Sequence, residues 1–307
     1  MSGRVQGEPT KVAVIGLGSM GFGMAESLLR GGFVVAGCDV AEPARERLRA
    51  AGGTPGVTPR EVAQGASVVV SVVVNAKQTE QVLFGAAGAI ETMQPGSVFI
   101  SSATMSPSDA ERLAAMSEEK GVLFLDAPIS GGAKRAAAGE LTIMASGEPE
   151  AFEKTDAVLA ALAQKVYRLG DKAGVGASVK MINQLLAGVH IAAACEAIAL
   201  ASKLGLDLST VYEVITASAG NSWMFENRMP HVLEGDYRPL SSIEIFVKDL
   251  GIIQDMARSE RYPAPIAAAA LQMYLAASGA GMGKDDDSSV ARVYAQLSGA
   301  TLPERKH

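Results

Sequence analysis

The stretch VAVIGLGSMGFGMAESLL, residues 12–29, constrains the fold of this chain more than any other feature. Three of its glycines follow the spacing G-x-G-x-x-G, after a β-branched strand pattern and at the start of an amphipathic helix pattern. Glycine there permits a tight turn, close approach of the backbone to a pyrophosphate, and close packing of helix on strand. The first helical turn also offers free N–H groups to phosphates. The pattern predicts a dinucleotide-binding loop made of Gly16, Leu17, Gly18, Ser19, Met20 and Gly21.

A carboxylate at the end of the next strand pattern adds a second signal for the same ligand. Asp39 closes the run FVVAGCDV and stands 18 residues after Gly21. An acid at this place accepts hydrogen bonds from the adenine ribose hydroxyls and repels a 2′-phosphate. The residues that follow Asp39 directly are Val40 and Ala41, so no arginine is adjacent to receive that phosphate. We therefore expect NAD, rather than NADP, as the cofactor.

Short β-branched runs alternate with amphipathic stretches through the first half of the chain. The run SVVVSVVV is continuously apolar, as in strands that are covered on both faces of a parallel sheet. Alternation of this kind predicts an α/β fold with a Rossmann-type doubly wound parallel sheet. Val74 and Asn75 end one of the strand patterns, so we expect them to border the cofactor. The predicted strands are 11–16, 33–40, 67–74, 97–104, 122–129 and 141–147.

The pattern changes near Gly170, where strand-like runs stop and the chain becomes rich in Ala, Leu and Met with helical spacing. A first helix of about 30 residues, roughly 45 Å long, should end at Gly205. We predict an NAD-binding domain over residues 1–172 and an all-helical substrate and oligomerisation domain over 173–307. The acidic run KDDD at 284–287 is expected to be a solvated helix start. Further helices are predicted at 208–218, 222–234, 243–259, 264–279 and 287–298.

Composition excludes several classes of partner. The 307 residues carry a net charge of −6 and few aromatic side chains, so we expect no nucleic-acid surface. The apolar stretch 181–204 contains several polar and charged residues, which predicts a buried helix of a soluble protein and no membrane span. Cys38 and Cys195 sit in apolar runs and read as buried thiols in a reducing compartment. Residues 1–10 are polar and lack a secretory pattern, so we expect a disordered lead-in and a cytoplasmic protein. No cluster of ligands predicts a metal site.

Four motifs in a fixed order resemble those of the β-hydroxyacid dehydrogenase family, which includes 3-hydroxyisobutyrate dehydrogenase, tartronate semialdehyde reductase and 6-phosphogluconate dehydrogenase. They are GLGSMG near the N-terminus, DAPISGGAKRAAAGELTIMASG at 126–147, the G-x-x-x-K block that ends at Lys180, and FVKDLG at 246–251. The resemblance extends from about residue 11 to residue 300. It implies an NAD-dependent oxidoreductase that acts on a small hydroxy acid.

The resemblance also implies roles for individual residues. The loop with Ser130, Gly131 and Gly132 would bind the substrate carboxylate, Ser130 through its hydroxyl and the glycines through their N–H groups. Thr104, in a turn where Ala103 replaces the family's usual serine, would lie near the nicotinamide ribose. Lys248 would lie close to the cofactor and lower the pKa of a neighbouring amine.

Lys180 stands among apolar residues at the start of the long helix, where it either reaches water or faces a polar group. By resemblance it is the general acid/base, which takes the proton of the substrate hydroxyl while the hydride leaves. Partial burial would favour the neutral amine that this step needs. Family members often have Asn four residues after the lysine, but here Asn183 is at i+3 and Gln184 at i+4. Either amide could hold a substrate oxygen.

Three other functions are compatible with the sequence. The first is a 3-hydroxy acid dehydrogenase or a semialdehyde reductase of the same family. The second is imine reduction on a similar fold, which Lys180 disfavours. The third is an NAD-binding scaffold without turnover. Because the long apolar helix exceeds what one helical domain can cover, we also predict a homodimer or homotetramer.

Overall fold

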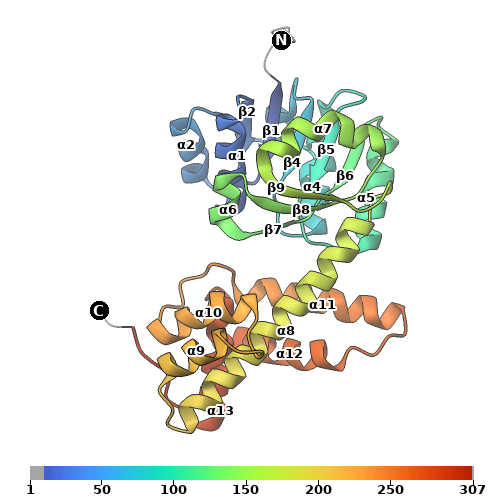
Figure 1. Cartoon of the computed structure of the whole chain (residues 1–307). Coiled ribbons are helices and arrows are strands. Elements are labelled where there is room, and N and C mark those ends of the chain that lie inside the picture. The colour runs from blue at the N-terminus through green and yellow to red at the C-terminus, as the bar shows by residue number, and fades with distance from the viewer. Residues whose placement is uncertain (1–9, 306–307) are drawn as a thin grey trace. The chain divides into compact units, whose positions relative to one another are not determined.

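The computed structural model describes residues 10–305 and divides the chain into two compact units, the first ending at Lys180 and the second beginning at Met181 (Figure 1). The polar lead-in that we predicted over residues 1–10 lies, apart from Thr10, outside the described residues.

Strands and helices alternate in the first unit, as the sequence predicts. The elements up to the sixth strand are β1 (Lys11–Ile15), α1 (Ser19–Arg30), β2 (Val34–Cys38), α2 (Glu42–Ala50), β3 (Thr54–Gly56), α3 (Pro59–Ala63), β4 (Val68–Ser71), α4 (Ala76–Phe84), the 3₁₀ turn η1 (Ala89–Glu91), β5 (Val98–Ser101), α5 (Pro107–Glu118) and β6 (Leu123–Asp126). The remainder consists of β7 (Ile129–Ser130), α6 (Gly132–Ala138), β8 (Leu141–Ala145), α7 (Pro149–Leu162) and β9 (Ala163–Arg168).

The main sheet has the strand order β3-β2-β1-β4-β5-β6, and its strand pairs are parallel. Alternate residues of each strand enter two separate cores, as the strand period of two requires. Val12 and Val14 of β1 pack with α1, α2, α6 and α7, whereas Ala13 and Ile15 pack with α3, α4 and α5. The doubly wound parallel sheet predicted from the sequence is therefore confirmed.

The chain reverses its direction of winding between β1 and β4, because β2 and β3 lie on one side of β1 while β4 to β6 lie on the other. Ligands of such sheets bind outside the carboxyl ends of the strands at this reversal. The strands end earlier than we predicted: β4 ends at Ser71, β5 at Ser101 and β6 at Asp126. The apolar residues beyond these ends belong to loops at the carboxyl edge of the sheet. Hydrophobic residues in such loops do not indicate a strand, and this is why the predicted strands were too long.

A second, three-stranded sheet has the order β7-β8-β9. Its middle strand β8 corresponds to the predicted strand 141–147, which therefore belongs to this small sheet and not to the doubly wound one. β7 and β8 pair antiparallel, and β8 and β9 parallel. β9, with the sequence AQKVYR, is mostly exposed and mixes polar with apolar residues, so it has no buried pattern that would predict a strand.

The second unit is helical, in agreement with the prediction. α8 (Val175–Lys203) starts in the first unit and continues into the second, and Gly205 after it has a left-handed φ of +73°. The other elements are α9 (Leu208–Thr216), α10 (Trp223–Glu234), α11 (Ile243–Ser259), α12 (Pro265–Ala277), the π turn η2 (Ser278–Met282), the 3₁₀ turn η3 (Asp287–Ser289) and α13 (Val290–Ser298). Their core includes Ile198, Phe225, Phe246 and Tyr274.

The acidic run at 284–287 is not the solvated helix start that we predicted. Asp286 and Asp287 have no exposed surface. Asp287 accepts a hydrogen bond from Arg228 Nε at 2.6 Å, and Asp286 accepts from the backbone N–H groups of Leu240 and Ser288. Burial is tolerated because these carboxylates have a cationic partner or several donors. Both cysteines are buried, as predicted.

Among the described residues, α8 is the helix that is long and apolar enough to cross a membrane by length and composition. A core helix passes the same test, and Met181, Ile191 and Ile198 of α8 belong to the core of the second unit. The prediction of a buried helix is only partly right. Ile182 and Leu186 are 60% and 49% exposed, so one face of α8 is not covered within this chain.

Candidate functional site

The glycine loop after β1 has the geometry that a dinucleotide requires. Gly16 has a φ of +91°, and a Cβ on Gly21 would lie 1.8 Å from the Gly16 carbonyl oxygen, so both positions need glycine. A Cβ on Gly18 would meet no atom within 4 Å, which leaves the space beside the loop open. Leu17 is fully buried in the core, Met20 packs against that core, and Ser19 is exposed.

The first turn of α1 is available to an anion. Gly18 precedes the helix without a side-chain cap, and no acidic residue stands in the first turn of this described helix. The N–H groups there keep their partial positive charge. The open space at Gly18 and the uncapped helix end together fit the pyrophosphate of a dinucleotide.

Asp39 follows β2 and holds the glycine loop in place. One carboxylate oxygen accepts a hydrogen bond from Leu17 N at 2.7 Å, and the other accepts from Ala41 N at 2.8 Å. Arg45 donates to the Asp39 backbone carbonyl at 2.7 Å. Each carboxylate oxygen can accept more than one hydrogen bond, so the side chain can fix the loop and still accept from ribose hydroxyls.

Three predicted cofactor contacts lie just beyond the carboxyl ends of β4 and β5. Val74 is 46% exposed. The Asn75 side chain caps α4 by accepting from Gln78 N at 2.9 Å, which gives this residue a structural role that the sequence reading did not include. Thr104 is half-buried. Like the glycine loop and Asp39, all three belong to loops at the carboxyl edge of the sheet.

The loop proposed for the substrate carboxylate joins β7 to α6. Gly131 has a φ of +137° and Gly132 a φ of +76°, values at which other residues are strained. Ser130 pairs with Thr142 across the small sheet. A Cβ on Gly132 would meet nothing within 4 Å, which leaves the space beside its Cα open. Two successive glycines of this kind allow the backbone amides to turn toward an anion.

Lys180 lies in α8 and is 6% exposed, so its side chain does not extend into bulk solvent. The turn of α8 that precedes it is fixed by an acid that the sequence reading did not assign. Asp126 Oδ2 accepts from Gly174 N at 3.0 Å and from Ala177 N at 2.8 Å, while Ser146 Oγ accepts from Gly176 N at 2.8 Å. These bonds occupy N–H groups that a helix start leaves free.

The glycine of the G-x-x-x-K block has a packing role in this arrangement. A Cβ on Gly176 would lie 2.4 Å from the Met144 carbonyl oxygen and 2.9 Å from the Asp126 carbonyl oxygen. Glycine therefore lets the first turn of α8 rest directly on β6 and β8. The spacing to Lys180 then places the amine one helical turn beyond this contact.

Burial strongly affects the Asp126 carboxyl group. The residue is 1% exposed, and desolvation raises its pKa from 3.8 to about 6, against the opposing effect of its hydrogen bonds with Ala177, Gly174 and Ser146. The sequence signal for this role of Asp126 was a charged residue at the end of an apolar strand. Its partners are 48 and 51 residues away, so the pairing could not be read from spacing.

The second unit connects three of the predicted residues through one carboxylate. Asp249, which is fully buried, accepts a hydrogen bond from Gln184 Nε2 at 2.6 Å, and Lys248 Nζ lies 2.6 Å from its other oxygen. Gln184 Oε1 in turn accepts from Asn183 Nδ2 at 3.0 Å. This role of Asp249 was also not predicted from the sequence. The signal that could have indicated it was an acidic residue on the otherwise apolar face of α11.

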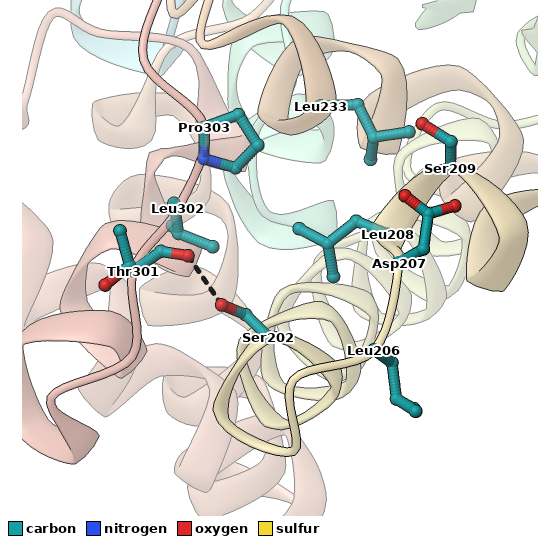
Figure 2. A pocket seen from close by; sticks show the side chains of 9 residues that line it. All are labelled: Ser202, Leu206, Asp207, Leu208, Ser209, Leu233, Thr301, Leu302 and Pro303. Atoms are coloured by element: carbon teal, nitrogen blue, oxygen red, sulfur yellow. Dashed lines mark hydrogen bonds between the residues drawn. The ribbon is translucent and has the colours of Figure 1, made fainter.

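A cavity of about 390 Å³ in the second unit does not include any predicted site residue. Its lining comes from the end of α8 and the residues that follow it, from α10 and from the segment 301–303 (Figure 2). The lining residues are Ser202, Leu206, Asp207, Leu208, Ser209, Leu233, Thr301, Leu302 and Pro303. The Asp207 carboxylate is already used as the cap of α9, where it accepts from Thr210 N at 2.8 Å. Among residues 10–305, no group of three or more His, Cys, Asp or Glu side chains could hold a metal ion.

Comparison with known proteins agrees with this geometry. Residues 11–170 match the family model described as the NAD binding domain of 6-phosphogluconate dehydrogenase. Residues 174–294 match the model described as NAD-binding of NADP-dependent 3-hydroxyisobutyrate dehydrogenase. L-threonate dehydrogenase of Cupriavidus necator is 56% identical over 92% of this chain and 95% of its own length.

Solved structures of 3-hydroxyisobutyrate dehydrogenases are also similar to this chain. A crystal structure of 3-hydroxyisobutyrate dehydrogenase from Salmonella typhimurium is 49% identical, with a TM-score of 0.89 over 92% of this chain and 99% of that one. The Mycobacterium tuberculosis 3-hydroxyisobutyrate dehydrogenase with L-serine is 31% identical, with a TM-score of 0.80 over 93% and 99%. The chain belongs to the β-hydroxyacid dehydrogenase family of 3-hydroxyisobutyrate dehydrogenase-like proteins and is an NAD-dependent hydroxy acid dehydrogenase.

Proposed function

We propose that this enzyme oxidises L-threonate at C2 to 2-oxo-tetronate, with Lys180 as the general acid/base. Relatives that carry the name L-threonate dehydrogenase are 47% to 56% identical over 92% to 98% of this chain, which supports the substrate. The observation that carries the mechanism is an amine that is 6% exposed one turn beyond the fixed first turn of α8. Burial favours the neutral form of such an amine.

The reaction removes a hydride and a proton from the substrate. NAD, held by the glycine loop and Asp39, would supply the acceptor for the hydride that leaves C2. The neutral amine of Lys180 accepts the proton of the C2 hydroxyl, so that the carbonyl can form, and the ammonium form returns it in the reverse direction. Ser130, through its hydroxyl, and Gly131 and Gly132, through their N–H groups, bind the carboxylate and orient C2. The amide of Asn183 or of Gln184 completes the substrate site.

The remaining assignments concern the cofactor. Residues Gly16 to Gly21 bind the pyrophosphate, and Asp39 accepts from the adenine ribose, which favours NAD over NADP. Val74, Asn75, Thr104 and Lys248 border the nicotinamide half. Residues 1–172 act as the NAD-binding domain, and 173–307 act as the substrate and oligomerisation domain.

A second candidate is the oxidation of 3-hydroxyisobutyrate, because the Salmonella typhimurium structure at 49% identity carries that name. The same family would also permit reduction of tartronate semialdehyde or of glyoxylate. Both alternatives use the same amine and the same carboxylate loop, and they differ in where the reacting carbon lies relative to the acid group.

The exposed face of α8 supports self-assembly. Val179, Ile182, Leu186 and Leu200 of α8 are between 38% and 60% exposed, and they follow one another at spacings of three, four and fourteen residues along the helix. Such a stripe packs against another helix in oligomers. We propose a cytoplasmic homodimer or homotetramer of this chain, without nucleic-acid or membrane partners.

The test is a panel of L-threonate, 3-hydroxyisobutyrate and L-serine, scored by NADH formation, with NADP in parallel. Tartronate semialdehyde and glyoxylate are scored in the reverse direction with NADH. Lys180→Ala should abolish oxidation and leave NAD affinity near that of the wild type. Lys203→Ala, an exposed lysine at the far end of the same helix, is the matched control and should retain activity. Near-normal turnover by Lys180→Ala would refute the assigned role, and preference for another acid would refute the substrate.

A further inference from the structure

We propose that Asn183 is the amide that contacts the substrate, presenting its carbonyl oxygen to a substrate hydroxyl, and that Gln184 and Asp249 act as positioning residues that hold it in this orientation. The proposal rests on the proposed function and refines it, since the sequence allows either amide. Its basis is the chain of hydrogen bonds from Asp249 through Gln184 to Asn183.

The chemistry of Asp249 sets the direction of this chain. A carboxylate can only accept, so the group that Gln184 turns toward Asp249 Oδ2, at 2.6 Å, must be its NH₂ group. The other oxygen of this acid, Asp249 Oδ1, lies 2.6 Å from Lys248 Nζ, so both oxygens face groups that carry N–H donors. The Gln184 carbonyl oxygen is therefore the end that faces Asn183.

The orientation of Asn183 follows from that of Gln184. An acceptor facing Asn183 requires a donor, so the Asn183 NH₂ group turns toward Gln184 Oε1 at 3.0 Å. Its carbonyl oxygen then points the other way. An unrestrained amide could present either end to a ligand, whereas this one is fixed as an acceptor by a buried acid.

Exposure distinguishes the two amides. Gln184 is 8% exposed and both ends of its amide are engaged, while Asn183 is half-buried and engaged at its nitrogen. Asn183 is also a helical neighbour of Lys180 at i+3, on the face that carries the amine. A small molecule that reaches the amine can thus reach Asn183, and it meets an acceptor there.

An acceptor at this place selects for hydroxyl groups. A site built to bond a substrate hydroxyl rejects an analogue that lacks it, because the buried polar group is left unpaired. We therefore expect Asn183 to favour polyhydroxylated acids over acids that carry only the reacting hydroxyl. 2-Hydroxybutyrate provides the comparison, since it has the carbon chain of threonate without the hydroxyls on C3 and C4.

The experiment is a double-mutant cycle of Asn183→Ala and Gln184→Ala, measured as kcat/KM for L-threonate. One hydrogen bond corresponds to roughly a tenfold change, so Asn183→Ala should lower kcat/KM by about that factor. The Asn183→Ala variant should also lose about tenfold in its preference for L-threonate over 2-hydroxybutyrate. Adding Gln184→Ala to Asn183→Ala should cause little further loss, because Gln184 acts only through Asn183.

Two outcomes would overturn the proposal. Losses that multiply in the double variant would mean that Gln184 contacts the substrate directly. An unchanged preference in Asn183→Ala would mean that its oxygen binds neither the C3 nor the C4 hydroxyl. The melting temperature and NAD affinity of every variant control for folding.

Exchanging the acid and the amide, with Gln184→Glu and Asp249→Asn together, tests the positioning role of these two residues without changing the net charge of the protein. Gln184→Glu alone places two carboxylates at 2.6 Å and should reduce both stability and kcat/KM. Combining it with Asp249→Asn restores a donor–acceptor pair and keeps an acceptor facing Asn183, so most of the lost kcat/KM should return. No recovery in a stably folded double variant would contradict the positioning role. A wild-type enzyme that oxidises no hydroxy acid would instead refute the proposed function.

Discussion

Replacing Asp126 by Asn should make the stability difference from the wild type strongly dependent on pH. The side chain of Asp126 is 1% exposed and accepts two backbone hydrogen bonds at the start of α8. Asparagine has nearly the same shape, and its carbonyl oxygen can accept from Gly174 N and Ala177 N. The substitution therefore keeps the packing and removes only the ability to ionise.

The magnitude follows from the pKa of Asp126, which burial raises from 3.8 to about 6. A rise of about two pH units corresponds to roughly 3 kcal/mol, at 1.36 kcal/mol per unit. Because the pKa is higher in the folded state, folding favours the protonated acid. The contribution is fully present below pH 3.8 and is lost as the pH rises through about 6. Relative to the wild type, Asp126→Asn should thus gain roughly 3 kcal/mol between about pH 4 and about pH 7.

The assay is urea denaturation of both proteins at a series of pH values, since the difference between them cancels the other titrating groups. Asp156→Asn is the matched control, because that side chain is 73% exposed on the same unit and should give a nearly constant difference. A difference for Asp126→Asn that stays flat across this range, or that moves in favour of the wild type as the pH rises, would show that the buried acid is not held as described. Asp126→Ala should be less stable than Asp126→Asn throughout, by about 1–3 kcal/mol for each backbone N–H left unpaired.

Three further predictions concern other parts of the chain. Gly18→Ala should leave the melting temperature unchanged and weaken NAD binding in titration calorimetry, because its Cβ meets nothing within 4 Å of the protein, whereas Gly21→Ala should impair both; equal effects of the two would contradict the loop geometry. Asp287→Ala should lower the free energy of unfolding by about 3–5 kcal/mol, since it strands the Arg228 guanidinium, which is 9% exposed; a loss of well under 1 kcal/mol would argue against a buried pair. Light scattering should give a mass well above 31.6 kDa that falls in Leu186→Glu, and a wild-type monomer would refute assembly through α8.

The features that sequence analysis could predict are those whose physical cause is local. The glycine loop is specified within six residues, because the turn, the close approach and the helix start all depend on neighbouring positions. Asp39 could be placed because the βαβ unit has a nearly fixed length, and its bond to Leu17 N spans only 22 residues. The helices of the second unit were predictable for the same reason, since their periodicity and their glycine ends are local.

The features that were missed depend on pairings between distant segments. Asp126 reaches the start of α8 across 48 to 51 residues, and Gln184 reaches Asp249 across 65. The run at 284–287 looked solvated because it is acidic, and its burial depends on Arg228, 59 residues away. A charged residue is expected to be exposed unless a buried partner for it is known. A single sequence does not show which distant residue is that partner.

These distant pairings also explain why a lysine can stand near the start of α8. The helix is anchored by Asp126 and Ser146 at residues 174–177 and by Asp249 at Gln184, so that Lys180 lies between two fixed points. Lys180 stands three residues after Ala177 and four residues before Gln184, which is about 4.5 Å and 6 Å along the helix axis. In the proposed mechanism, proton transfer requires the Lys180 amine within hydrogen-bond reach of the substrate hydroxyl, and misplacement by about 1 Å can cost about a hundredfold in rate. If Lys180 has the proposed role, these anchors offer a physical reason for the buried acids: each costs desolvation, and each fixes a turn of α8 next to the amine within its own unit.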